Sequence, residues 1–285
     1  MSGTYYVPAS SRWPVIAVLV LAVLAIGAGS SLSFGWGGGI AIVGFIGVLL
    51  VMYFWFGDVV KESRSGLYDE QMDRSFRQGM GWFIFSEVMF FGAFFGALFY
   101  IRTFALPWLD GEGAKGISAL LWPDFVSSWP LLNPPGADIK GPDAVIDPWH
   151  LPFINTLLLL SSSVTLTAAH HALRADNRKL VKVWLAVTLL LGAVFLVVQG
   201  IEYIEAYRHL GLTLQAGVYG GTFFLLTGFH GLHVTIGAII LFVIWLRVIR
   251  GHFTAEHHFA FEAAAWYWHF VDVVWVGLFI FVYVV

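Results

Sequence analysis

The sequence predicts an all-α integral membrane protein with seven transmembrane helices. Of its 285 residues, 59% are hydrophobic and only 12% are charged, whereas a soluble domain carries about twice that share of charge. The mean hydropathy is +0.79, and 26 Phe and 13 Trp supply more apolar surface than one core can bury. Lipid must therefore solvate much of the chain.

The composition also excludes several classes of site. The chain has no cysteine, which excludes disulfides, iron–sulfur clusters, thiolate-bound zinc and a cysteine nucleophile. Any metal would have to bind histidines or carboxylates. The net charge of -3 offers no broad basic face, so we do not expect nucleic acid as a partner.

The first two spans are predicted to form a hairpin within residues 1–56. Residues 14–34 are long enough to cross the bilayer at 1.5 Å per residue, and they exceed a signal-peptide core. The single basic flank, Arg12, and the interfacial Trp13 also favour a retained span. A glycine-rich turn at 35–39 leads into a second apolar run that ends at Phe56.

The remaining spans are predicted to form a five-helix bundle over residues 79–285. Residues 57–78 are highly charged and read as a cytoplasmic loop, and residues 103–150 are rich in Pro, Gly and Asp and read as a long extramembrane loop. The five predicted spans are 80–102, 151–172, 181–207, 218–249 and 259–285.

The basic residues predict the orientation. Eleven Lys and Arg fall in the loops on the N-terminal side of the predicted membrane and four on the other side. By the positive-inside rule the N-terminus is cytoplasmic. Seven spans then place the C-terminus on the opposite, periplasmic side.

Glu87 is the most informative residue, because it lies in the third span. An ionised carboxylate in hydrocarbon costs several kcal/mol, so Glu87 must be protonated, paired or hydrated. Two interpretations stay open. One is a proton relay or protonatable gate, and the other is a neutral carboxyl hydrogen-bonded between helices.

Histidines offer few combinations with metal-ligand spacing. His230 and His233 are three residues apart on one helix face, and interhelical hydrogen bonding, with Glu87 as a partner, is favoured over metal or haem ligation. His170 and His171 are adjacent, so their side chains point about 100° apart. The sequence therefore predicts no metal site.

Three further carboxylates lie in or near predicted spans. Glu202 and Glu205 could form an acid–base pair for hydrolysis, but the chain shows no nucleophile beside them, so a solvated or headgroup-facing rim is favoured. Asp272, which follows Glu262 in the last span, lies too deep for an interfacial belt. It would need an internal partner.

Several of these strings resemble subunit III of cytochrome c oxidase. The resemblance covers nearly the whole chain in order. The matching strings are residues 261–275 (FEAAAWYWHFVDVVW), 257–259 (HHF), 229–233 (FHGLH), 217–220 (GVYG), 85–88 (FSEV), 151–156 (LPFINT), 168–171 (AAHH) and 202–206 (EYIEA).

The resemblance implies seven helices, of which the first two lean away from a five-helix bundle and leave a V-shaped, lipid-filled cleft. It also implies an accessory chain without catalytic residues or cofactors of its own, because haems and coppers belong to partner subunits I and II. The implied role is to brace the catalytic subunit, hold phospholipids, keep proton uptake fast and limit inactivation during turnover. A route for oxygen through the cleft has been suggested for the family.

Some residue roles are implied by position. Glu87 matches the family's buried, carbodiimide-reactive carboxyl. The positions matching phospholipid contacts are Trp55, Glu62, Phe90 and Arg247. Phe56 and Gly57 depart from the family's pattern, which often has a second aromatic and an Arg there. The implied setting is a bacterial plasma membrane, and the long loop would meet another subunit or a cytochrome c donor.

Two rival classes remain. One is a membrane enzyme with its own metal, such as a bis-histidine haem protein or a di-iron desaturase, since ten histidines could supply ligands. A desaturase needs several histidine boxes on one face, and only His230 and His233 have helical ligand spacing. The other is a proton-coupled transporter that uses Glu87 and Asp272.

Overall fold

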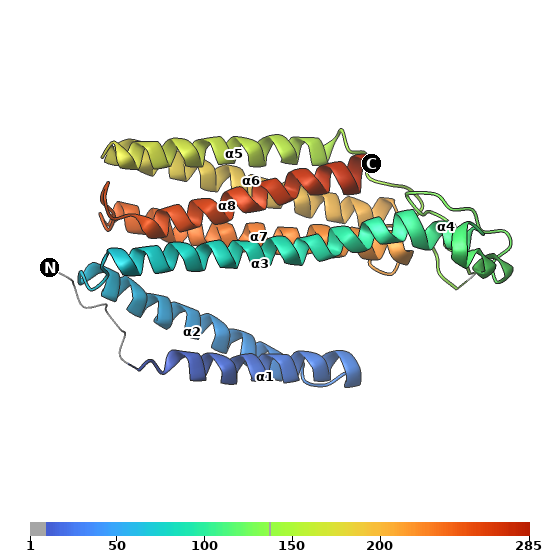
Figure 1. Ribbon diagram of the computed structural model, residues 1–285, viewed down its shortest axis with the longest axis horizontal. Coiled ribbons are helices and arrows are strands. Elements are labelled where there is room, and N and C mark those ends of the chain that lie inside the picture. Colours follow the sequence, from blue (N-terminus) through green and yellow to red (C-terminus); the bar gives the residue numbers. More distant parts are fainter. Residues whose placement is uncertain (1–9, 137) are drawn as a thin grey trace. The chain divides into compact units, whose positions relative to one another are not determined.

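The computed structural model describes residues 10–136 and 138–285 of the chain, and within these ranges it is helical with no strand. Seven helices are long and apolar enough to cross a membrane, as the sequence predicts. The helices belong to two compact units that meet in sequence after Gln78, and both are drawn in Figure 1. Residues 1–9 of the N-terminal segment lie outside the described residues.

The first unit contains the helical hairpin of α1, Trp13–Phe34, and α2, Gly38–Arg64. The turn between them uses Gly35 and Gly37, whose φ angles of 72° and 99° suit glycine. Two other glycines let the helix backbones touch. A Cβ added at Gly27 would lie 2.3 Å from the Ala41 nitrogen, and one at Gly44 would lie 2.4 Å from the Leu24 nitrogen.

The charged segment 57–78 is mostly helical, which differs from the predicted loop. Helix α2 continues to Arg64, and α3, Glu70–Tyr100, begins after only five connecting residues. Side-chain pairs at helical spacing support these ends, with Lys61 3.0 Å from Asp58 and Arg77 2.7 Å from Asp73. Charge indicates where a chain leaves hydrocarbon, but a helix can continue into water, so charge does not mark the helix end.

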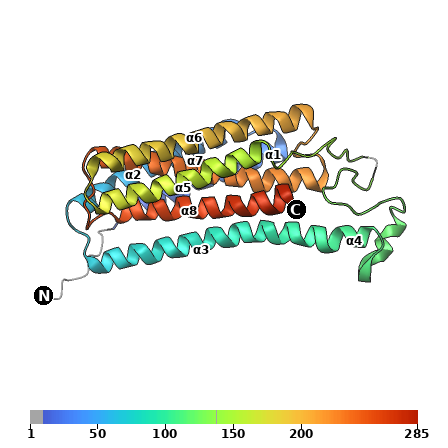
Figure 2. The same ribbon diagram turned by 90° about the horizontal axis from the view of Figure 1, so that it is seen from above.

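The second unit is a bundle that contains α3 from Gly79 onward and four further long helices. These helices run side by side in Figure 2. These are α5, Leu151–Arg174; α6, Arg178–His209; α7, Gly217–Ile249; and α8, Phe259–Leu278, which a π-helical turn extends to Val284. Each of α6 and α8 contacts both α5 and α7. Helix α3 packs on α7 and α8, since Phe90 lies 5.1 Å from Phe229 and Phe91 lies 6.1 Å from Phe270 between ring centroids.

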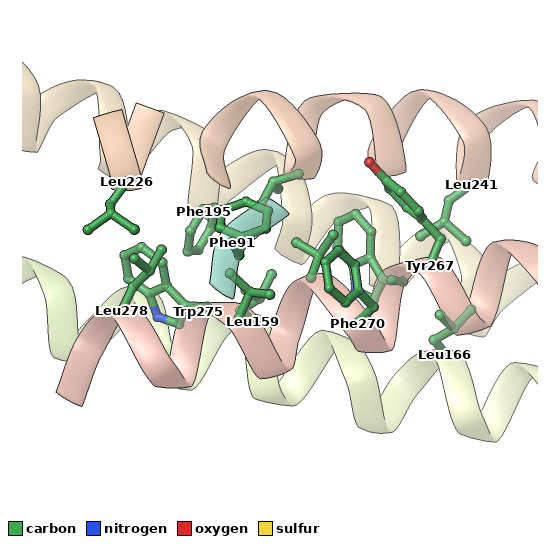
Figure 3. Packing of buried hydrophobic residues seen from close by; sticks show 14 of the residues in the cluster. Phe91, Leu159, Leu166, Phe195, Leu226, Leu241, Tyr267, Phe270, Trp275 and Leu278 are labelled. Atoms are coloured by element: carbon green, nitrogen blue, oxygen red, sulfur yellow. The ribbon is translucent and has the colours of Figure 1, made fainter. Parts of the chain in front are cut away.

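Helix α8 contributes Tyr267, Phe270, Trp275 and Leu278 to the buried hydrophobic cluster (Figure 3). In an apolar 18-residue stretch of α8, about 61% is buried, against 28% in the corresponding stretches of α5, α6 and α7. Helix α8 is therefore the span most enclosed by protein. Trp268 is fully buried, and its indole nitrogen donates to Ser162 Oγ on α5 at 2.9 Å. Its ring lies against Gly192 of α6 and Gly237 of α7, where an added Cβ would come within 2.8 and 2.9 Å of the ring.

The segment after α3 is more ordered than the predicted loop. A π-helical turn, Ile101–Ala105, and helix α4, Leu106–Leu109, continue α3, and a 3₁₀ helix follows at Gly113–Leu120. The rest of the segment packs on one end of the bundle. Trp129 contacts the ring of Tyr219 at 5.4 Å, and the Asp143 backbone nitrogen donates to the Leu210 carbonyl at 2.9 Å.

Candidate functional site

Glu87 of α3 and His233 of α7 form an ionisable pair between two spans. The Oε2 atom of Glu87 lies 2.9 Å from Nε2 of His233. Both side chains are mostly buried, with 21% of Glu87 and 12% of His233 exposed. The structure thus brings together two residues that lie 146 positions apart in the sequence.

The second hydrogen bond of His233 restricts where the shared proton can be. Its Nδ1 lies 2.6 Å from the Phe229 carbonyl oxygen, which can only accept, so Nδ1 carries a hydrogen. Nε2 then either accepts a hydrogen from a neutral Glu87 carboxyl or, as imidazolium, donates to its carboxylate. A neutral pair and an ion pair are two positions of one proton in the same geometry.

Aromatic rings surround this pair. The His233 ring lies 5.0 Å from Phe91 and 6.0 Å from Phe90, and it stacks on Tyr267 at 6.4 Å between centroids. Phe90, one of the predicted lipid contacts, therefore borders the ionisable pair. Such rings exclude water, which strengthens the hydrogen bond between the two side chains.

His230 turns away from the Glu87 pair toward α8. Its Nε2 donates to the Val271 carbonyl oxygen at 3.2 Å, and its ring packs against Trp275 and Phe195 at 5.0 and 5.8 Å. The Nδ1 atom is buried without a hydrogen-bond partner among the described residues. His230 and His233 thus contact different helices and do not face one metal position.

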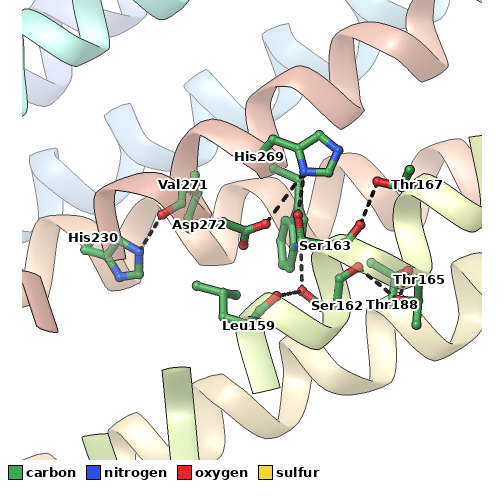
Figure 4. A network of polar contacts seen from close by, with 11 residues as sticks. Leu159, Ser162, Ser163, Thr165, Thr167, Thr188, His230, His269, Val271 and Asp272 are labelled. Atoms are coloured by element: carbon green, nitrogen blue, oxygen red, sulfur yellow. Dashed lines mark hydrogen bonds and ion pairs between the residues drawn. The ribbon is translucent and has the colours of Figure 1, made fainter. Parts of the chain in front are cut away.

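Asp272 of α8 lies in a network with His269 and Ser163 (Figure 4). Ser163 Oγ bonds His269 Nδ1 at 2.6 Å, while the Asp272 carboxylate is 3.8 Å from that same nitrogen. A hydrolytic triad needs the acid and the serine on opposite ring nitrogens, so this arrangement does not match one. The nearest ionisable neighbour of the buried Asp272 is therefore in its own helix.

Glu202 is fully buried, which corrects the expectation that it forms a solvated rim with Glu205. The Tyr283 hydroxyl donates to Glu202 Oε1 at 2.6 Å, and Glu205 alone is exposed. The i, i+3 spacing left open which side of α6 each carboxylate occupies. The contact of Glu202 with Tyr283, which lies in the C-terminal π-helical turn, accounts for the difference.

The predicted lipid contacts are divided between the two units. In the first unit Glu62 accepts from the Tyr68 hydroxyl at 3.0 Å, and Trp55 is half-buried. In the second unit the Arg247 guanidinium lies 4.5 Å above the ring of Phe253, and Phe90 contacts His233.

The structure also brings together three potential ligands that the sequence analysis did not combine. These are His170 near the end of α5, His258 before α8 and Glu262 in the first turn of α8. Each offers one ligand atom, and the three atoms lie within 4.8 Å of one another. One signal was present in the sequence, because His258 and Glu262 are four residues apart at a helix start. The third ligand, His170, comes from 88 residues earlier.

These features define a multi-pass helical membrane protein whose buried polar side chains bond to backbone carbonyls and to side chains of neighbouring helices. A sequence model described as cytochrome c oxidase subunit III matches residues 3–108 and 129–285. Proteins named cytochrome c oxidase subunit 3 are similar along nearly their full lengths. The one from Arabidopsis thaliana is 40% identical over 98% of this chain and 96% of its own. Those from Marchantia polymorpha and Hippopotamus amphibius are 42% and 39% identical over 96% and 98% of this chain, and over 93% and 96% of their own.

The chain therefore belongs to the cytochrome c oxidase subunit III family, as the resemblance in sequence indicated. It is a membrane subunit of a cytochrome c oxidase, within a respiratory chain. This membership favours an oxidase subunit over a desaturase or a transporter.

Proposed function

We propose that this chain is the accessory, non-redox subunit of a haem–copper oxidase that reduces oxygen to water. In this role it contacts the catalytic subunit I and subunit II, stabilises subunit I, holds phospholipids against it and supports proton uptake. Oxygen access through bound lipid is part of the same proposal. The electron donor, a cytochrome c, meets the complex rather than a redox centre in this chain.

One observation supports the non-redox assignment, namely that three histidines within the spans bond to groups of the protein. His230 bonds Val271, His233 bonds Phe229 and Glu87, and His269 bonds Ser163. A haem or copper ligand instead presents a ring nitrogen to the metal. These side chains are arranged to hold helices together.

The role in proton uptake and inhibitor sensitivity is proposed for Glu87. It is the carboxylate that α3 contributes to the bundle, and its pairing with His233 keeps one exchangeable proton at an apolar, partly exposed position. Because the two protonation states share one geometry, a proton can be exchanged there without repacking the helices.

Phospholipid binding is proposed for the surroundings of Trp55, Glu62, Phe90 and Arg247. In the apolar 18-residue stretches of α1 and α2 only 6% and 11% is buried, so the hairpin presents extensive apolar surface. Arg247 near the end of α7 supplies a guanidinium suited to a phosphate. We also propose that the helix ends rich in Lys and Arg, including the end of α7, lie on the cytoplasmic side.

The test is removal of this chain from the purified oxidase. The remaining complex should keep its haem and copper content but lose activity progressively during turnover and take up protons more slowly. Adding back the intact chain is the control and should restore sustained activity. Loss of one haem or copper in proportion to the removed chain would contradict the non-redox assignment.

A further inference from the structure

We propose that His170, His258 and Glu262 form a binding site for a divalent transition-metal ion of the zinc class. Two imidazoles and one carboxylate are a ligand set that zinc accepts with an open fourth position. They are a poor set for Mg²⁺ or Ca²⁺, which prefer oxygen ligands throughout. The site is separate from the Glu87 pair and from the proposed lipid contacts.

The distances between the ligand atoms match a coordination shell. Nε2 of His170 lies 3.2 Å from Nε2 of His258 and 3.7 Å from Oε1 of Glu262. Nε2 of His258 lies 3.2 Å from the same oxygen. Zinc bonds of about 2.0–2.1 Å in a tetrahedron separate ligand atoms by about 3.3 Å. An ion can therefore be accommodated with little movement of the three side chains.

The protonation of His258 favours a cation at this position. Its Nδ1 lies 3.1 Å from the Thr254 carbonyl oxygen, so Nδ1 carries the hydrogen and a neutral ring presents a lone pair at Nε2. This lone pair lies 3.2 Å from His170 Nε2, whose hydrogen it can accept, and 3.2 Å from Oε1 of Glu262. A divalent ion in place of that hydrogen can accept an electron pair from each of the three side chains. A hydrogen bond from the distal ring nitrogen to a carbonyl is also how metal-binding histidines are commonly oriented.

The site is partly open to solvent. His258 is largely buried, whereas 29% of the His170 side chain and 16% of the Glu262 side chain are exposed, which leaves a route for an ion. The ring of His170 also packs on Phe261 at 5.5 Å. A bound ion would connect the end of α5 to the start of α8. With three protein ligands and an open position, binding should be reversible.

The test uses the full chain in mild detergent, stripped with a chelator and titrated with ZnCl₂ against a competing chromophoric chelator. We expect one Zn²⁺ per chain, and we expect His170→Ala and Glu262→Gln each to weaken binding by about 10-fold or more. His171→Ala and His257→Ala are matched controls, because each removes an exposed histidine next to a ligand. They should leave the affinity unchanged.

Two outcomes would overturn the proposal. One is failure of the unaltered chain to compete for Zn²⁺, which would mean that a proton alone occupies the position. The other is an equal loss of affinity in the control variants. X-ray absorption of Zn²⁺ on the unaltered chain needs no variant to fold, and we expect two imidazoles and at least one oxygen in the first shell. A shell without imidazole would reject the site.

Discussion

His230 and His233 lie one turn apart on α7, yet their rings contact different helices. Three residues advance a helix by about 300°, which leaves the two side chains about 60° apart. In the crowded interior this difference directs His230 to the Val271 carbonyl on α8 and His233 to Glu87 on α3. Each ring then meets a partner of different chemistry, and only His233 shares a proton with a carboxyl group.

Replacing Glu87 by Gln should preserve assembly. The Gln amide can donate to the lone pair of His233 Nε2, as a neutral carboxyl would, so the interhelical hydrogen bond is kept. Glu87→Ala instead leaves His233 Nε2 unpaired and should destabilise the bundle by about 1–3 kcal/mol. Unfolding in a denaturing detergent series measures both variants. Equal destabilisation by Gln and Ala would mean that an ionised Glu87 is required.

Carbodiimide should label Glu87 in preference to Glu205. The reagent is apolar and attacks a protonated carboxyl, and Glu87 is the carboxyl that shares a proton inside the apolar bundle. Glu205 is exposed, outside the apolar interior that the reagent enters. Glu202 is too buried to serve as a comparison. Peptide mapping after modification gives the result, and labelling of Glu205 without Glu87 would reject a proton on the Glu87 carboxyl.

At the scale of helices, hydropathy predicted all seven spans because each apolar run is at least as long as the bilayer is thick. The ends of the helices were less predictable. The charged residues after Phe56 and before Met80 indicate water, yet the Lys, Arg and Glu among them are good helix formers, so α2 and α3 extend through them. Likewise Pro107 lies at the first turn of α4, where proline is tolerated, and helical structure continues past the predicted start of the loop.

Gly44→Leu should disrupt the hairpin of α1 and α2. Even a Cβ at Gly44 would come within 2.4 Å of the Leu24 backbone, so the helices must separate, at a cost of about 1–3 kcal/mol or more. Hydrogen exchange of the α1 and α2 amides should then become faster. Gly57→Leu on the same helix is the matched control, because nothing lies within 4 Å of its Cβ position. Equal effects of the two substitutions would contradict backbone contact at Gly44.

At the scale of the whole molecule, the sites depend on contacts that a single sequence does not specify. The intramembrane position of Glu87 indicated that it needs a partner, and histidine was a reasonable candidate. The group of His170, His258 and Glu262 could not be inferred in the same way, because it requires the end of α5 to lie beside the start of α8. Similarly, the burial of Glu202 follows from the position of Tyr283, 81 residues away.

Arg247→Ala should lower the phospholipid retained by the intact purified oxidase. The guanidinium lies near the end of α7, above the ring of Phe253, where a basic group can bind a phosphate at the membrane surface. Removing it takes away the charge-assisted hydrogen bonds, so bound lipid should fall by about one molecule per complex. Lipid mass spectrometry on purified complexes measures the change.

Arg250→Ala is the matched control for this lipid site. Arg250 carries the same charge three residues later, at the C-terminal cap of α7, but it is exposed. An exposed arginine on the surface interacts with headgroups through screened, exchangeable contacts, and these should not survive purification. Retained lipid should therefore fall in Arg247→Ala and stay at the parental level in Arg250→Ala. Identical lipid counts in the parent and in both variants would reject Arg247 as a phospholipid contact, while equal losses would show that general basic charge at this end of α7, rather than a specific contact, holds the lipid.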